Sequence, residues 1–354
     1  MVKGTLSKHN PAMNILVIGG SGFIGPFLIR QLQRRGHSVA VFHRGTNQSV
    51  LPPEVEHITG DRRELARHKP SFARLKPDVV IDLILSSGRQ ARALVGTFRG
   101  IARRLVAASS MDVYRAVGVL HGSEPGELEP LPLTEESPLR TKLQTYPPER
   151  VRMLQKVFGW LDDEYDKIPV EQEILSDHEL PGTVLRLPMI YGPGDPLHRL
   201  FPLLKRMDDG RKKILFADNA AAWRASRGYV ENVAHALALA ATDGRAAGKI
   251  YNVAEEQAFS ELEWAKSVAA QTGWHGELIV LPRHQVPKHL IQPGNTAQHW
   301  VASSQRIRSE LGYREIVSQE EAMRRTIAWE RSHPPTEVSA EQFDYAAEDA
   351  ALAA

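Results

Sequence analysis

The sequence predicts an α/β fold, a doubly wound parallel sheet, and the length of the chain leaves room for a smaller C-terminal α/β lobe. Its N-terminal part carries the prediction. The apolar run from Asn14 to Gly20 is long enough for a strand buried on both faces. After a glycine-rich turn, apolar residues recur at helical spacing up to Gly36: Phe23, Ile24, Phe27, Leu28 and Leu32. A second strand is expected from His37 to Arg44. Strand, helix and strand in this order form the right-handed crossover unit of a parallel sheet.

The turn after the first strand contains glycines at positions 19, 20, 22 and 25. Gly19 and Gly22 would let the backbone turn and approach a pyrophosphate, and Gly25 would allow close packing of helix against strand. The N-terminus of the helix would face the phosphates. Because the glycines leave a buried strand and open a helix, they predict a dinucleotide site rather than an ordinary tight turn.

Further strands are expected at 55–60, 77–85 and 102–110, with a helical pattern at 89–101 between the last two. Strands that alternate with helices over this length indicate a doubly wound sheet.

The end of the second strand predicts which cofactor is bound. An acidic residue there favours the free 2′-hydroxyl of NAD, whereas this chain has His43 followed by Arg44. A 2′-phosphate would meet a cation, so NADP is favoured, with NAD as the alternative. The alternative is that Arg44 is a solvated arginine in a loop and does not contact the cofactor.

Composition limits the classes that need to be considered. The chain has 354 residues, a net charge of +2 and no cysteine, which excludes disulfides, thiolate metal sites and cysteine nucleophiles. So small a net charge does not favour nucleic acid as a partner. We find neither a secretory signal nor an apolar run long enough to span a membrane, so a cytoplasmic protein is expected. Residues 1–12 are expected to form a flexible extension, and the acidic, Ala-rich 334–354 a loose tail.

Six segments occur in an order that resembles the extended short-chain dehydrogenase/reductase family, in its branch of NAD(P)-dependent epimerases and dehydratases. They are "GGSGFIG" at 19–25, "GD" at 60–61, "SSMDVY" at 109–114, "LRLPMIYGPGD" at 185–195, "RGYVENVA" at 227–234 and "YNVAEE" at 251–256. The resemblance implies a Rossmann-type cofactor domain at 13–190 and about 228–256, and a substrate-binding lobe at 191–227 and about 257–333.

The resemblance also implies roles for individual residues. Those expected to contact the cofactor, together with the two from the second strand, are Gly19, Gly22, Phe23, Ile24, Gly25, His43, Arg44, Asp61, Arg62, Leu83, Leu187 and Pro188. Asp112 and Arg227 are expected to contact the substrate. Asn232 looks like the N-cap of the helix that follows it.

In this family a tyrosine exchanges a proton with the substrate oxygen while hydride passes to or from the nicotinamide. The alignment implies Ser110 and Tyr165 as the residues that contact this oxygen. Related 4,6-dehydratases carry Thr-Asp-Glu at the serine position, whereas this chain has Ser110-Met111-Asp112. Because Met111 cannot protonate a leaving hydroxyl, oxidoreduction or epimerisation fits better than dehydration.

The family's tyrosine is followed four residues later by a lysine on the same helix face, but here that position is Pro169. If the helix begins near Pro169, the residues before it could be extended, and residues two apart would then face the same way. We therefore advance the hypothesis that Lys167 stands in for the missing lysine; the alternative is a surface lysine. Tyr146, with Arg150 four residues on, competes for the catalytic role, but the two prolines after it disfavour it.

Residues 115–164 form an insertion that is either a lid over the site or a surface addition. His284, His289 and His299 lack metal-ligand spacing, so no metal is expected.

The favoured function is an NAD(P)-dependent dehydrogenase that interconverts alcohol and ketone on a sugar, sugar nucleotide or polyol. A 4-epimerase with tightly bound NAD is one alternative, and a weakly catalytic cofactor-binding sensor or RNA-associated protein is another. The family also implies a homodimer through the helices near 89–99 and 169–177.

Overall fold

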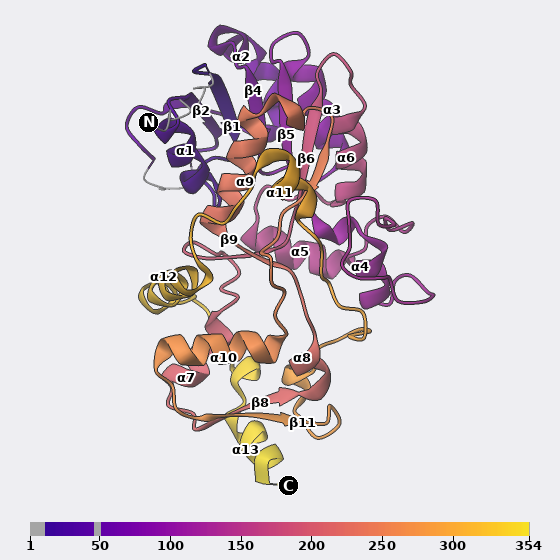
Figure 1. Cartoon of the computed structure of the whole chain (residues 1–354), viewed down its shortest axis with the longest axis vertical. Helices are drawn as coiled ribbons and strands as arrows, with labels where there is room; N and C mark the ends of the chain where they lie inside the picture. Colours follow the sequence, from indigo (N-terminus) through magenta and orange to yellow (C-terminus); the bar gives the residue numbers. More distant parts are fainter. Residues whose placement is uncertain (1–10, 46–50, 354) are drawn as a thin grey trace, which may run out of the picture.

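The structure is a computed structural model that describes residues 11–45 and 51–353, and its larger lobe is built on one seven-stranded sheet (Figure 1). The strands lie in the order β10-β6-β5-β4-β1-β2-β3, and every neighbouring pair is parallel. Their bounds are β1 Asn14–Ile18, β2 Ser38–His43, β3 Glu56–Thr59, β4 Val79–Asp82, β5 Arg104–Ser110, β6 Gly182–Leu187 and β10 Ile250–Asn252. The predicted fold class, an α/β fold with a parallel sheet, is confirmed.

Helices cover both faces of this sheet. One face carries α1 (Gly25–Arg34), α9 (Val230–Thr242) and α11 (Gln305–Leu311), whose buried side chains share one apolar cluster with the strands. The other face carries α2 (Lys69–Leu75), α3 (Gly88–Phe98) and α6 (Lys167–Leu175), which share a second cluster. Burial on both faces explains the nearly continuous apolar runs of the strands.

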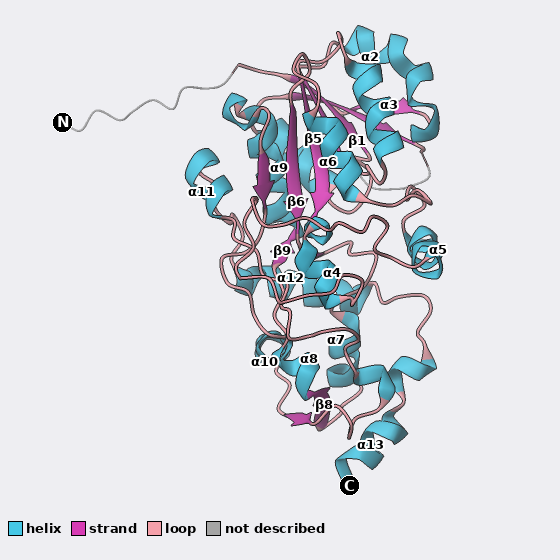
Figure 2. Cartoon of the chain, turned by 90° about the vertical axis from the view of Figure 1, so that its right-hand side faces the viewer, coloured by secondary structure: helices cyan, strands magenta, loops and turns pink. Residues whose placement is uncertain are grey.

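The smaller lobe lies beyond the carboxyl ends of the strands, at the far end of an elongated molecule (Figure 2). It contains the parallel pair β8 (Lys213–Ala217) and β11 (Glu277–Leu281). A second parallel pair, β7 (Met189–Tyr191) and β9 (Arg227–Tyr229), follows β6 and precedes α9. The helices of this part are α7 (Phe201–Asp208), α8 (Asp218–Ala222), α10 (Glu261–Thr272) and α12 (Gln319–Ser332).

Two local features show how the sequence sets helix starts. Helix α10 begins with a capping box, in which Ser260 accepts from the Glu263 N–H and the Glu263 carboxylate accepts from the Ser260 N–H. The expectation that Asn232 caps α9 is wrong, because this helix already begins at Val230. The Asn232 side chain instead binds the backbone of Ile316 and Val317, which ties α9 to the segment before α12.

The C-terminal segment differs from the loose tail that was expected. It forms a 3-10 helix (Ala340–Phe343) and α13 (Tyr345–Ala353), which lies against the smaller lobe. Glu348 is buried and contacts Arg206, and Asp349 pairs with Arg211. The composition suggested disorder because the tail contains few apolar residues, but its acidic side chains find basic partners on α7 and beyond.

Of the expected N-terminal extension, residues 1–10 lie outside the described part of the chain. Over the described residues, no helix combines the length and the apolar character needed to cross a membrane.

Candidate active site

The turn after β1 has the geometry that its glycines predict. Gly19 has φ +80°, and a Cβ there would lie 2.6 Å from Ile84 Cγ2. The Gly22 N–H donates to the Gly19 carbonyl at 3.1 Å, which closes the turn. A Cβ on Gly25 would lie 1.9 Å from the Gly20 carbonyl oxygen, so only glycine lets α1 start this close to the turn. The turn and the helix N-terminus form a glycine cradle, an arrangement that commonly binds phosphate groups in proteins.

This turn opens into a cleft of about 2230 Å³ that runs between the lobes. The cleft is lined by every residue predicted for the site except Gly25, whose effect is on packing. Leu83 lies just beyond the carboxyl end of β4, and Leu187 and Pro188 lie at the end of β6. Ligands in open α/β sheets bind at this edge.

At the end of β2, His43 is held as a neutral side chain. Its Nδ1 accepts from the Gly45 N–H at 3.1 Å, so the ring proton is on Nε2, which is 2.8 Å from His57 Nδ1. Burial and the neighbouring His57 lower the pKa of His43. Arg44 is exposed and donates to the Gly159 carbonyl at 3.3 Å. The cation at this end of the cleft is therefore Arg44 and not His43.

The predicted pair Asp61 and Arg62 point to different partners. Asp61 accepts from the Arg63 guanidinium at 2.6 Å, and chiefly this hydrogen bond lowers the pKa of Asp61 to about 2. Arg62 is buried, and its Nη2 lies 2.7 Å from the buried carboxylate of Asp82 on β4. Arg62 thus borders the cleft, and the buried carboxylate of Asp82 neutralises its charge. Asp82 was missed by the sequence interpretation, although a carboxylate that ends a buried strand signals such a partner.

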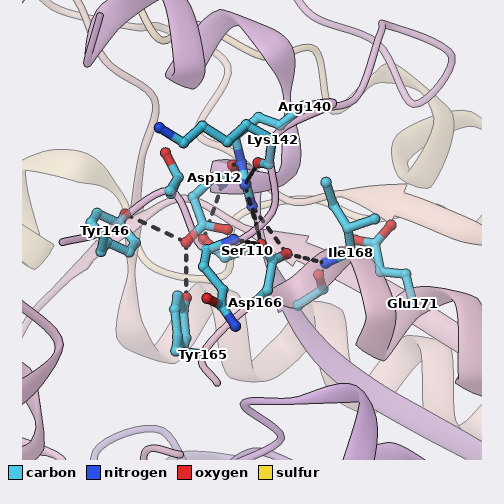
Figure 3. A network of polar contacts seen from close by, with 12 residues as sticks. Ser110, Asp112, Arg140, Lys142, Tyr146, Tyr165, Asp166, Ile168 and Glu171 are labelled. Carbon is cyan, nitrogen blue, oxygen red and sulfur yellow. Dashed lines mark hydrogen bonds and ion pairs between the residues drawn. The ribbon is translucent and has the colours of Figure 1, made fainter. Parts of the chain in front are cut away.

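Two of the predicted catalytic residues, Ser110 and Tyr165, lie beside the buried Asp112 (Figure 3). The Tyr165 hydroxyl donates to Asp112 Oδ2 at 2.8 Å, and the Tyr146 hydroxyl lies 3.5 Å from the same oxygen. Ser110 Oγ accepts from the Asp112 N–H at 3.1 Å. Tyr165 is half-buried and borders the cleft, whereas Asp112 is buried behind it. Asp112 Oδ1 has no hydrogen-bond partner among the described residues.

The electrostatics of this cluster follow from burial. Burial raises the pKa of Asp112, and the charge of Arg140 and the hydrogen bond from Tyr165 oppose this shift. Burial, and then the nearby Asp112 charge, raise the pKa of Tyr165 well above its ordinary value. Tyr165 is therefore protonated at rest, and its hydroxyl proton is directed at the Asp112 carboxylate.

The start of α6 explains why the fourth residue after Tyr165 is not a lysine. Asp166 is the N-cap in extended geometry, and it accepts from the Ile168 N–H at 2.8 Å. Pro169 lies in the first turn, where a missing N–H has no cost. Pro169 packs on α3, because a Cβ on Gly88 would lie 2.8 Å from Pro169 Cβ. This position faces a neighbouring helix, so a lysine there would not face the cleft.

Lys167 is buried and points inward. Its amine donates to the carbonyls of Leu85 and Ala108, the latter at 3.0 Å. The amine also lies 6.0 Å from the ring centroids of Trp160 and Tyr165. Burial lowers the pKa of Lys167 to about 8, although the Asp112 and Asp82 charges oppose the shift. The amine is thus close to Tyr165, but it is held by the strand ends rather than by the tyrosine hydroxyl.

The predicted substrate residue Arg227 lies on the other side of the cleft. It forms an ion pair with Glu261, donates to the Phe259 carbonyl at 3.3 Å and lies over the Trp264 ring at 4.5 Å from the centroid. Its charge is therefore balanced before any ligand arrives.

The insertion at 115–164 contains α4 (Arg115–Leu120) and α5 (Pro148–Val157), and it supplies site residues that sequence reasoning missed. Arg140 forms a buried ion pair with Asp166 and donates to the Asp112 carbonyl at 2.6 Å. Asp162 anchors the segment before Tyr165, since it accepts from Ser87 at 2.8 Å. Tyr146, which competes with Tyr165 in the sequence, has its hydroxyl near the same carboxylate. No sequence signal brought Arg140 to this place, because the loop before it has no periodicity.

Comparison with known proteins agrees with this geometry. The model of the NAD dependent epimerase/dehydratase family matches residues 15–254. A chloroplast stem-loop binding protein of 41 kDa from Arabidopsis thaliana is 25% identical over 85% of this chain and 74% of its own length. A decarboxylating sterol-4-alpha-carboxylate 3-dehydrogenase from Schizosaccharomyces pombe is 25% identical over 90% of this chain and 97% of its own. The structure of the Bordetella bronchiseptica enzyme WbmG in complex with NAD and UDP superposes with a TM-score of 0.64 at 18% identity, covering 91% of this chain and 96% of that one.

Proposed function

The chain belongs to the NAD dependent epimerase/dehydratase family, and we propose that it interconverts a secondary alcohol and a ketone on a sugar-like substrate by hydride transfer. One observation carries the proposal: the Tyr165 hydroxyl borders the cleft beside Ser110 and is hydrogen-bonded to the buried carboxylate of Asp112. This arrangement supplies a proton donor and a proton acceptor at the carboxyl edge of the sheet, where the nicotinamide end of a cofactor would lie.

A nicotinamide cofactor bound in this cleft would supply the hydride acceptor for oxidation of the carbinol carbon and the hydride donor for reduction of the carbonyl carbon. In the oxidation direction, Tyr165 takes the proton of the substrate hydroxyl while its own proton passes to Asp112 Oδ2, 2.8 Å away. Asp112 ends as a neutral acid, and the substrate carbon and oxygen are left as a ketone. Ser110 holds the reacting oxygen, and the reverse transfers serve reduction.

The electrostatics of the cluster support this coupled transfer. Because burial raises the pKa of Asp112, this carboxylate is a better proton acceptor than an exposed aspartate. A free phenolate is disfavoured, since burial and the Asp112 charge raise the pKa of Tyr165. Lys167 stands in for the missing lysine by placing a positive charge near both residues, and its burial keeps that charge unscreened.

NADP is the proposed cofactor, and NAD remains the alternative. Arg44 is an exposed cation at the end of β2, and this strand end has no carboxylate that would bind a 2′-hydroxyl. Arg44→Ala should therefore weaken NADP binding about tenfold or more and leave NAD binding unchanged. Equal loss for both cofactors would contradict this choice.

The first experiment identifies the nucleotide that the purified protein releases, and then follows nicotinamide absorbance with neutral sugars and polyols. Exchangeable NADP with net turnover supports the dehydrogenase. Tightly retained NAD without net reduction supports the 4-epimerase instead, which is the alternative in the same family.

The second experiment tests the roles of Tyr165 and Asp112. Tyr165→Phe should lower kcat by roughly 10²–10⁴-fold, the usual contribution of general acid–base catalysis.

Oxidation requires ionised Asp112, so kcat/KM should fall as the pH decreases through the raised pKa of this residue. Asp112→Asn should remove this acid limb and lower kcat. Tyr146→Phe is the matched comparison, since its hydroxyl is 3.5 Å from Asp112, and its effect should be smaller. Full turnover by Tyr165→Phe would exclude the proposed chemistry.

A second candidate function follows from one relative, which is named as a stem-loop binding protein. Binding of a stem-loop RNA at physiological salt by this chain, unchanged by Tyr165→Phe, would support it. The net charge of +2 is against such binding.

A further inference from the structure

The substrate half of the cleft, formed by residues after β7, has its positive charges already neutralised. The described basic side chains that this half contributes are Arg199, Arg206, Arg227 and His289. Arg199 Nη1 lies 2.6 Å from Asp195 Oδ1, and Arg227 pairs with Glu261. Asp195 is buried, so this carboxylate stays with its arginine rather than turning to solvent.

The remaining two basic side chains contact the same carboxylate of the C-terminal helix. Glu348 Oε1 lies 2.6 Å from Arg206 Nη2 and 3.0 Å from His289 Nε2. Arg206 also donates to the carbonyls of Pro202 and Gln342, at 2.9 and 2.8 Å. Both Arg206 and Glu348 are buried, so the Glu348 carboxylate on α13 takes the position beside Arg206 that an anionic ligand would otherwise take.

The rest of this half of the cleft is largely aromatic and aliphatic. Its wall includes Leu203, Phe216, Trp223, Leu290 and Trp300. The Trp223 indole N–H donates to the Gln298 carbonyl at 3.1 Å, and Trp223 also lines the cleft. Rings of this kind bind apolar faces, including the C–H faces of sugars, through dispersion and burial.

We propose that the substrate is an uncharged alcohol or ketone that presents an apolar face, and that it carries no nucleoside diphosphate. A diphosphate requires cations with free hydrogen-bonding capacity, most often arginines in bidentate geometry. In this half of the cleft it would meet arginines that are already paired, and it would be repelled by Glu261, which lines the cleft. This inference rests on the proposed function, because it assigns a substrate class to the same cleft.

The first test compares three ligands of one sugar by calorimetry on the protein saturated with its cofactor: phenyl β-glucoside, glucose 1-phosphate and UDP-glucose. The apolar glucoside should bind at least about tenfold more tightly than either anionic compound. Tighter binding of UDP-glucose would overturn the proposal. Because this experiment measures binding and not hydride transfer, its outcome is independent of whether the proposed reaction occurs.

The second test frees one cation without disturbing the buried C-terminal contact. Glu261 lies at the rim of the cleft, where 28% of its side chain is exposed, so Glu261→Gln should fold normally and leave Arg227 without a counter-charge. UDP should then bind about tenfold more tightly than it binds the unaltered protein, as expected for a gained charge-assisted contact. Glu337→Gln is the matched control, because Glu337 is exposed and does not line the cleft. If Glu261→Gln leaves the affinity for UDP unchanged, the paired carboxylates do not exclude diphosphates and the proposal fails.

Discussion

Charged side chains border both sides of the cleft, but the two lobes use them differently. On the side of the seven-stranded sheet, Arg62 is paired with Asp82, but Asp112 accepts from a tyrosine and Lys167 donates to two backbone carbonyls. Neither of these last two charges contacts an opposite charge. On the side of the smaller lobe, Arg199, Arg206 and Arg227 each contact a carboxylate. Buried charges without counter-ions have strongly shifted pKa values, and such groups can exchange protons. Paired charges hold structure together instead. If the proposed function holds, the side of the seven-stranded sheet is the reactive wall of the cleft, and the side of the smaller lobe is the wall that gives the cleft its shape.

The largest change in stability is expected for the C-terminal helix. Glu348→Ala leaves Arg206 buried without its counter-charge and should lower the free energy of unfolding by about 3–5 kcal/mol. Asp349→Ala on the same helix removes only an exposed partner of Arg211, so its effect should be much smaller. Urea unfolding followed by circular dichroism measures both. Equal effects would mean that the C-terminal pairing does not depend on burial.

The buried Lys167 should make the stability of the protein depend on pH. Its pKa is lowered from 10.5 to about 8, so between these values the unfolded chain binds a proton that the folded chain does not. Stability should therefore rise with pH across this window, by roughly 3 kcal/mol relative to Lys167→Met. The cost of the buried charge is fully present below about pH 8. Urea unfolding of both proteins at about pH 7.5 and pH 10 measures the difference. Parallel pH dependences would show that the amine titrates normally.

The glycine turn offers a comparison within the cofactor side. Gly25→Ala places a Cβ 1.9 Å from the Gly20 carbonyl and should cost about 1–3 kcal/mol of stability. In Gly22→Ala the nearest atom to the new Cβ is 3.4 Å away, so the fold should be retained. The added methyl would occupy the cradle, and cofactor affinity should fall. Thermal unfolding and cofactor titration distinguish the two effects, and normal affinity in Gly22→Ala would contradict the placement of the pyrophosphate.

The smallest effect is expected at the start of α10 in the smaller lobe. Ser260→Ala removes one half of the capping box and should cost about 1 kcal/mol. Ser267→Ala on the same helix removes only a hydroxyl that donates to the Glu263 carbonyl, and its cost should be smaller. Neither change should alter cofactor binding, since this helix start belongs to the other lobe. Altered cofactor binding would mean that the lobes are coupled.

Much of the fold could be predicted because its signals are local. The strands β1 and β2 and the turn between them follow from an apolar run, a glycine spacing and a helical period, all of which act within a few residues. The capping box at Ser260 also depends on only four consecutive residues. By contrast, Asn232 had the chemistry of an N-cap, but its side chain binds a loop more than eighty residues away.

The site was predictable only in part. Ser110, Asp112 and Tyr165 could be proposed from motifs, and all three border the cleft. The hydrogen bond between Tyr165 and Asp112 spans 53 residues of chain, and no local pattern encodes it. The orientation of Lys167 depends on the carbonyls of Leu85 and Ala108, which reach it from two different strand ends.

The sequence by itself determined the parallel sheet, the glycine cradle and the residue types at the reactive edge, because each depends on short-range sterics and periodicity. The tertiary structure decided which charges remain available. It placed Pro169 against Gly88, set Asp112 behind Tyr165 and docked Glu348 on Arg206. These outcomes depend on burial and on partners far apart in the chain, and both exist only after the two lobes and the C-terminal helix have packed.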